Sequence, residues 1–433
     1  MSGQYSTSVK VQYLQPRTHL NNTLTEFRLD QDTAYFPNLR LSNIGITATA
    51  VQAHNQLTGT YGCIKNIRLM DGSVEISATR HANRWLSFMS QRDHNQNNIC
   101  VHSRLSKAQV GYMMNSNDKN VYPITNGNDV IAVSNDTDTD TDKRLGLLDL
   151  RKVFPILQNL TILDTSLMKN LKVVIEWTTD NTQVCLSKGA TGIKIKEPEL
   201  LCDQVMAEGA INALRKSQKS VVWDEIEHDQ YNIPAVANPA DAGDVVVQPT
   251  SSVVNGFDNK YVSRMVLMKA PAVKTDLYVG DNAVGLGNFA SVNLWREKLQ
   301  LRVNGANIFA GDGLSKTAQK AMLMSQSWGD LNILPFSNRN NVGLEDRNAV
   351  VQNSSGVPKL EDDKKMSARI GQSDYIGFSL EDKIRQLNFQ HERTCLNNTL
   401  APRQNEISYD IHIFAECRKI LQIGNGGYKI AYM

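Results

Sequence analysis

The densest group of side chains that could do chemistry is the run Glu225, Glu227, His228 and Asp229. Carboxylates and imidazoles are common metal ligands, but an ion needs its ligands on one side of the backbone. On a β-strand, successive side chains point to opposite faces, so the three carboxylates would share a face and His228 would point away. The run therefore favours a solvated strand edge or an intersubunit salt bridge over a metal site.

Other potential ligands and nucleophiles occur as isolated pairs. Cys100 lies near His102, and His412 lies near Cys417, without further ligand residues close by in the sequence. The HExxH and GxSxG motifs, which would indicate a metalloprotease or a serine hydrolase, do not occur. We therefore expect no catalytic, cofactor-binding or metal-binding residues, no cofactor and no enzymatic activity.

Two loops resemble ligand-binding motifs without matching them. Residues 135–142 alternate Asp and Thr, but an EF-hand needs Gly and Glu at its sixth and twelfth positions. Counted from Asp136, those positions hold Thr141 and Leu147. Residues 311–317 have the composition of a phosphate loop but lack the four-residue gap before Gly-Lys-Ser/Thr. We expect the first to be a solvated loop tip and the second to cap the following helix.

The composition is typical of a globular protein with two domains. A chain of 433 residues is long for one hydrophobic core. Hydrophobic residues at 41% and charged residues at 21% argue against disorder. The 46 Lys and Arg nearly balance the 44 Asp and Glu, and no run of basic residues occurs. This balance argues against a dedicated nucleic-acid-binding protein.

Targeting and redox signals are also weak. The first ten residues are polar, which is not typical of a signal peptide, and no stretch reaches the roughly 18 apolar residues that would span a bilayer. The six cysteines are scattered without CxxC spacing. We therefore expect reduced, mostly buried thiols made in a reducing compartment.

One strand–turn–strand–helix plan occurs twice in the chain. The first copy covers residues 64–89 with a turn at Asp71-Gly72, and the second starts at Leu299 with a turn at Asn304-Gly305. The turns are 233 residues apart, the difference between 304 and 71. The expected helix caps are Ser77 and Ser315, and the expected apolar helix faces are Ala78, Ala82, Trp85, Leu86 and Met89 in the first copy and Ala318, Ala321 and Met322 in the second.

The two copies differ in phase by one residue. Leu69 lies two residues before Asp71, whereas Val303 lies one residue before Asn304. A slip of one residue moves a strand's buried side chains to the opposite face. We therefore expect either turns of different length or a repeat that is only approximate.

The remaining pattern predicts an all-β protein of two tandem antiparallel sandwiches. Short alternating strands dominate, and the longest helical pattern lies at mid-chain. We expect polar surface loops at 231–257, with room for one strand at Val245–Val247, and at 337–372. The expected domains are an N-terminal arm at 1–20, a first sandwich at 21–200, a connecting helix at 201–219 and a second sandwich at 220–433.

Short motifs that occur in the same order along the chain resemble a known family. In the first half they include Tyr35-Phe-Pro-Asn-Leu-Arg, the run from Ile64 to Glu75, Val153-Phe-Pro-Ile-Leu and the run from Leu167 to Trp177. In the second half they are Ile226-Glu-His-Asp-Gln-Tyr, Leu301-Arg-Val-Asn-Gly-Ala-Asn, Trp328-Gly-Asp-Leu-Asn and Asp410-Ile-His-Ile-Phe-Ala-Glu. Over most of residues 24–433 the chain resembles the double jelly-roll major capsid proteins of polinton-like viruses and virophage relatives.

The resemblance implies a structural role in a virion. It implies two eight-stranded jelly rolls with strands roughly normal to the capsid surface, and a homotrimer of pseudo-hexagonal outline that tiles an icosahedral shell around double-stranded DNA. The implied partners are neighbouring capsomers, penton proteins and minor capsid or cement proteins, without sequence-specific nucleic-acid binding. We expect the arm at 1–20 to extend beneath a neighbour or the trimer base.

Three alternatives are a minor capsid or penton component, a glycan-binding β-sandwich and a cupin-type metal enzyme. A glycan-binding sandwich would expose aromatic side chains on a concave sheet, whereas a cupin needs a His-rich strand pair. The eight histidines are dispersed. The five tryptophans lie beside predicted strands or helices, so we expect core positions for Trp85, Trp177, Trp223, Trp295 and Trp328.

Overall fold

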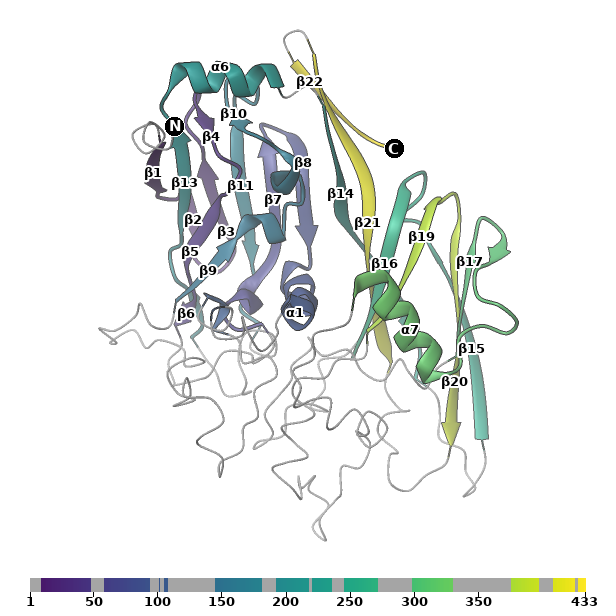
Figure 1. Cartoon of the computed structure of the whole chain (residues 1–433). Coiled ribbons are helices and arrows are strands. Elements are labelled where there is room, and N and C mark those ends of the chain that lie inside the picture. The colour runs from purple at the N-terminus through teal and green to yellow at the C-terminus, as the bar shows by residue number, and fades with distance from the viewer. Residues whose placement is uncertain are drawn as a thin grey trace.

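The computed structural model describes two β-sandwiches side by side, with α6 across the end of the first and α1 and α7 where the two meet (Figure 1). It describes residues 9–47, 58–93, 101, 105–107, 145–180, 192–217, 220–235, 245–271, 298–329, 375–396, 408–424 and 427–433. Within these ranges, no helix has both the length and the apolar character needed to cross a membrane.

The first sandwich is built from two antiparallel sheets and a short strand pair. One sheet contains β1 (Val9–Leu14), β4 (Ala34–Tyr35), β5 (Arg40–Ile44), β9 (Gly146–Asp149), β10 (Leu163–Asp164) and β13 (Glu199–Val205). The other has the order β2 (Thr18–Leu20), β3 (Leu24–Arg28), β11 (Leu171–Trp177), β7 (Ile64–Asp71) and β8 (Val74–Arg80). The strand pair is β6 (Ile46–Thr47) with β12 (Lys194–Ile195), and the helical segments are η1 (Thr60–Cys63), α1 (Ala82–Asp93), η3 (Leu150–Lys152), α4 (Ile156–Asn159) and α6 (Glu208–Ser217).

The second sandwich repeats this architecture with longer strands. One sheet contains β14 (Ser220–Ile233), β21 (Tyr409–Gly424), β16 (Tyr261–Pro271), β19 (Ile376–Lys383) and β22 (Gly427–Tyr432). The other has the order β15 (Val245–Val254), β20 (Leu387–Leu396), β17 (Lys298–Val303) and β18 (Ala306–Asn307), with α7 (Thr317–Trp328) following β18 in the chain. The expected all-β fold class is confirmed.

Alternation along the strands decides which side chains enter each core. In β21, Ile411, Ile413 and Cys417 point into the second sandwich, and Phe414 points to the other face and joins the core of the first. The first core therefore continues across the boundary between the sandwiches. We call this boundary the interdomain seam: β8, α1 and α4 of the first sandwich against β14, β21 and α7 of the second.

The repeated unit has equivalent turns in both copies. Asp71 pairs with Val74 and Val303 pairs with Ala306, so both turns contain two residues. They are Gly72-Ser73 and Asn304-Gly305, with positive φ at Gly72 (59°), Asn304 (51°) and Gly305 (86°), as primed hairpin turns require. The predicted position of the first turn was wrong by one residue. With it corrected, Leu69 and Leu301 both lie three residues before their turn and are fully buried, so the phase difference disappears.

The predicted helix starts were wrong in both copies. Ser77 and Ala78 belong to β8, because β8 pairs with β7 as far as Arg80 and α1 begins only at Ala82. Helix α7 begins at Thr317, and its N-cap residue is Lys316 without a side-chain cap. Two residues of the predicted apolar face of α7, Ala318 and Met322, are exposed, and the buried positions are Lys320, Met324, Ser327 and Trp328.

Three predicted segments also differ from the structure. Part of the expected arm forms β1 and β2, since β1 pairs with β13 over six residues and β2 pairs with β3. The expected connecting helix begins with a strand, because β13 is held between β1 on one side and β4 and β5 on the other, and only α6 is helical. The expected loop at 231–257 contains the end of β14 and all of β15, which begins at the expected strand Val245–Val247 and runs on to Val254. Its Phe257 is fully buried in the second core. The expected loop at 337–372 lies outside the described residues.

Candidate functional site

The interdomain seam is the site where side chains from distant parts of the chain meet. Helix α1 lies at its centre, and each residue from 82 to 90 is buried. An amphipathic surface helix would expose one face, so this continuous burial reflects contact on all sides. Aromatic rings fill the seam: Phe88 lies 5.2 Å from Trp328 and 5.0 Å from Tyr375 between ring centroids, and Trp85 lies 5.7 Å from Phe414.

A buried carboxylate crosses the seam. Glu225 of β14 is 1% exposed and accepts hydrogen bonds from the Ser77 hydroxyl (2.8 Å) and the Ala78 backbone N–H (2.9 Å) of β8. The indole N–H of Trp223 donates to its second oxygen (2.6 Å), and the Lys419 ammonium lies 3.7 Å away. Burial raises the pKa of Glu225 and these partners oppose that rise. The contacts satisfy an acidic group that would otherwise destabilise the seam.

The sequence correctly predicted that the side chains of residues 225–229 alternate between two faces, but it did not predict the environment of Glu225. Glu225 and Glu227 both lie within 4.0 Å of the Lys419 ammonium nitrogen, whereas His228 packs against Phe414 at 4.9 Å between rings. The carboxylates and the histidine therefore point apart, as predicted. The expected solvated edge is wrong for Glu225, which is buried between the two sandwiches.

Histidines from three distant positions meet at the same seam. His81 follows β8, His228 lies on β14 and His412 lies on β21, and their ligand nitrogens all lie within 4.8 Å of one another. Among the described residues, this is the one group of three His, Cys, Asp or Glu side chains with such spacing. Sequence reasoning missed it because 147 residues separate His81 from His228, the difference between their numbers, and 184 separate His228 from His412.

The pair that the sequence did suggest, His412 with Cys417, is not a site. The two residues lie five positions apart on β21, so their side chains point to opposite faces. His412 points toward the seam and Cys417 is buried in the second core, where burial raises the pKa of its thiol. Three cysteines among the described residues, Cys63, Cys202 and Cys417, are buried and not in disulfides, as expected.

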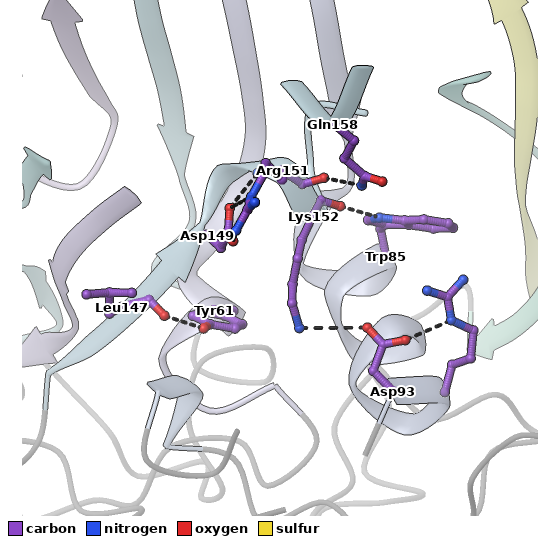
Figure 2. Close-up of polar contacts among 9 residues, drawn as sticks. Tyr61, Trp85, Asp93, Leu147, Asp149, Arg151, Lys152 and Gln158 are labelled. Atoms are coloured by element: carbon purple, nitrogen blue, oxygen red, sulfur yellow. Dashed lines mark hydrogen bonds and ion pairs between the residues drawn. The ribbon is translucent and has the colours of Figure 1, made fainter. Parts of the chain in front are cut away.

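A separate surface cleft of about 590 Å³ lies on the first sandwich. Figure 2 shows how its charged residues are paired: Arg151 binds Asp149 with a shortest N–O distance of 2.5 Å, and the Lys152 ammonium lies 3.7 Å from Asp93. Both cations are therefore neutralised locally, and the cleft offers no strong anion site. Its lining residues are Phe36, Pro37, Asn38, Asp149, Arg151, Lys152, Leu157, Gln158 and Leu160.

The glycine-rich segment before α7 forms a structural turn and not a phosphate cradle. Leu299 and Leu314 exchange backbone hydrogen bonds of 2.9 and 2.7 Å, which ties the segment to β17. Gly313 has φ of 106°, and a Cβ there would lie 2.6 Å from the Leu299 carbonyl oxygen. The expected capping role was wrong, because the N-cap residue of α7 is Lys316 and not Ser315, and no side chain there makes a cap hydrogen bond.

The remaining predicted positions divide into buried residues and residues that are not described. Four tryptophans occupy core positions as expected: Trp85, Trp177, Trp223 and Trp328 are at most 5% exposed. Trp295, Cys100, His102 and the loop at 135–142 lie outside the described residues.

Comparison with known structures identifies the fold. No protein-family model matches the sequence, and no curated protein is detectably similar to it. The structure of the mavirus major capsid protein is similar, with a TM-score of 0.58 at 11% identity over 100% of this chain and 91% of that chain. The Sputnik virophage structure gives 0.54 at 10% identity over 98% and 88%, and the PBCV-1 virus capsid gives 0.52 at 10% identity over 98% and 97%. The chain therefore has the double jelly-roll fold of these viral capsid proteins.

Proposed function

We propose that this chain is the major capsid protein of a double-stranded DNA virus, located in the virion. Three chains form a pseudo-hexagonal capsomer, and capsomers tile an icosahedral shell together with penton and minor capsid proteins. The chain has no enzymatic role in this proposal. The observation that carries it is the continuous core across the interdomain seam, because it fixes two similar sandwiches as one rigid tile of the double jelly-roll fold.

The open strand edges at two opposite ends of the molecule support a trimer. Strand β1 pairs only with β13 among the described strands, and β15 pairs only with β20. They lie on opposite sides of the molecule, away from the seam (Figure 1). An unpaired strand edge is a template for contact with another chain. A head-to-tail contact between these two ends closes into a ring when its rotation is a third of a turn.

Exposed apolar side chains gather at the same two ends. Val11 and Tyr13 of β1 are 52% and 63% exposed, and Val246 and Val247 of β15 are 39% and 48% exposed. Their burial between chains would be favourable by roughly 25 cal/mol per Å². The net charge of +2 also suits subunits that pack edge to edge without strong self-repulsion.

The oligomeric state of the full-length protein tests the proposal. Size-exclusion chromatography with light scattering should give about 145 kDa, three times the 48.3 kDa chain, and negative-stain images should show a six-sided outline. A protein that remains monomeric at high concentration would contradict the trimer.

A variant pair tests the edges. Val11→Glu combined with Tyr13→Glu should shift the protein toward monomer, because two charges would have to be desolvated in the contact. Val74→Glu is the control, since Val74 is 48% exposed and lies at a hairpin end away from both edges. Equal trimer yields in both variants would show that the contact between chains lies on another surface.

A further inference from the structure

The three histidines at the interdomain seam come from both sandwiches. His81 lies between β8 and α1 of the first, whereas His228 and His412 lie on neighbouring strands of the second. The imidazole centroids of His81 and His228 are 4.3 Å apart, and each lies 5.3 Å from that of His412. Nitrogens Nε2 of His228 and Nδ1 of His412 are 3.0 Å apart.

These distances are close to those of a metal site. Two imidazole nitrogens bound to one tetrahedral zinc ion at about 2.0–2.1 Å lie roughly 3.4 Å apart. One pair is already nearer than that, and all three nitrogens fall within 4.8 Å. Small rotations of the rings would bring the three nitrogens around one ion, with the fourth position open to water or an anion.

The backbone at His81 supports a specific role for its ring. His81 has φ of 51°, in the left-handed region that residues other than glycine seldom occupy. The structure holds it there, since its N–H donates to the Asn66 side chain (3.0 Å) and its carbonyl accepts from the N–H groups of Arg84 and Trp85 at the start of α1. An uncommon conformation held by several contacts is typical of functional positions.

The protonation state and the exposure of the three imidazole rings suit metal ligands. Burial lowers the pKa of His81 to about 4 and lowers those of His228 and His412 well below the ordinary value, so the rings are neutral near pH 7 and offer lone pairs. His81 and His228 are only partly buried, so both residues contact solvent. Buried Arg84 lies nearby and disfavours added positive charge, although Asp410 partly offsets it. An anionic fourth ligand would reduce that repulsion.

We propose that His81, His228 and His412 bind a divalent transition-metal ion, zinc or a chemically similar ion, which fastens the first sandwich to the second. Imidazole suits zinc, copper, nickel and cobalt better than magnesium or calcium. This structural site departs from the absence of metal ligands expected from the sequence. It does not depend on the proposed capsid role.

Metal binding by the full-length protein tests the site. Protein stripped with a chelator is dialysed against Zn²⁺ or Co²⁺, the bound metal is measured by mass spectrometry, and the Co²⁺ absorption spectrum is recorded. We expect one ion per chain, a tetrahedral or five-coordinate Co²⁺ spectrum and a higher unfolding temperature with Zn²⁺. Less than a tenth of an ion per chain, or an octahedral spectrum, would overturn the proposal.

Matched variants locate the ion. His81→Asn keeps a residue that tolerates the left-handed backbone, and His228→Gln removes a ligand from the other sandwich. Each should reduce bound metal at least tenfold and abolish the Zn²⁺-dependent shift in unfolding temperature. His19→Asn is the control, because His19 lies on β2, outside the proposed site, and forms a hydrogen bond with Thr25. If both site variants keep the circular dichroism of the native protein and bind metal as the control does, the assignment is wrong.

Discussion

The two copies of the strand–turn–strand–helix unit share a local plan but occupy different environments. In the first copy, β8 and α1 lie against the second sandwich, and residues 82–90 of α1 are all buried. In the second copy, α7 packs on β19 with one face, and its Met322 is 54% exposed. Local sequence therefore sets the plan, whereas the neighbour decides whether the helix becomes core or surface.

The same difference applies to charged groups. The first copy supplies Ser77 and Ala78 to the buried carboxylate of Glu225. In the second copy, Lys298 of β17 forms a partly exposed pair with Glu392 of the neighbouring strand β20 at 3.4 Å. Buried ionic contacts destabilise strongly when one partner is lost, and exposed ones contribute little. The first copy should therefore be far more sensitive to substitution.

The largest effect should come from the centre of the seam. Trp85→Ala removes a 2%-exposed ring from the aromatic cluster and leaves a cavity, so it should lower the free energy of unfolding by about 3–5 kcal/mol. Met322→Ala on α7 is the matched change in the second copy and should stay within about 0.5 kcal/mol. Urea unfolding followed by fluorescence and circular dichroism measures both, and similar losses would show that the two helices are equivalent.

The buried carboxylate should give the next largest effect. Glu225→Gln keeps the shape but loses a charged acceptor for the N–H groups of Ala78 and Trp223 and for Lys419, which should destabilise by about 2–3 kcal/mol. Glu392→Gln, which removes the carboxylate paired with Lys298 of the second copy, should change the unfolding free energy by less than about 1 kcal/mol. A neutral result for Glu225→Gln would mean that the carboxylate is protonated in the folded protein.

The packing of α7 on its sheet can be tested at a single glycine. A Cβ at Gly377 of β19 would lie 2.4 Å from Cδ1 of Trp328 and 2.6 Å from Sδ of Met324. Gly377→Ala should therefore push α7 outward and destabilise by about 1–3 kcal/mol. Gly305→Ala is the control. A Cβ at Gly305 would have no neighbour within 4 Å, so this variant shows only the backbone strain of a non-glycine residue at a φ of 86°. Local hydrogen exchange of α7 should increase in the first variant and not in the second.

The smallest predicted effect concerns α6, where an ion pair assists the apolar contacts. Burial alone would raise the pKa of Asp164, but hydrogen bonds from Arg215 (2.6 and 2.8 Å) and Ser166 outweigh it, so the pKa is lowered. A lowered pKa stabilises the fold above the ordinary value of 3.8 and loses that contribution as pH falls through the folded value.

Arg215→Met should therefore cost about 1 kcal/mol near neutral pH. The difference from the natural protein should vanish in acid below the folded pKa of Asp164. Unfolding free energies of both proteins across the acid range measure this, with Lys216→Met as the control. A difference that is independent of pH would assign the effect to packing of the Arg215 side chain.

Local patterns predicted much of the architecture. Alternation placed Ile411 and Ile413 on one face of β21, and the separation of Glu225 from His228 on β14 followed from the same two-residue period. Glycine and asparagine placed the hairpin turns to within one residue. These features depend on backbone geometry over a few residues, which the sequence specifies directly.

Features set by distant partners could not be predicted. Residues 199–205 have a helical apolar pattern, but β1, β4 and β5 recruit them as a strand through hydrogen bonds to segments more than 150 residues away. Serine is a common helix cap, yet Ser77 lies within β8 because it pairs with Leu69 of β7. In both cases tertiary pairing outweighs a small local preference.

The sequence by itself determined two β-sandwiches, their repeated hairpins and the identity of most core side chains, because these depend on short-range alternation and turn chemistry. Only the tertiary structure decided which helix became the centre of the seam, that Glu225 is buried, and that three dispersed histidines meet. Those outcomes depend on how the two sandwiches pack. Packing brings together residues that lie far apart in the sequence, so no local pattern predicts their contact.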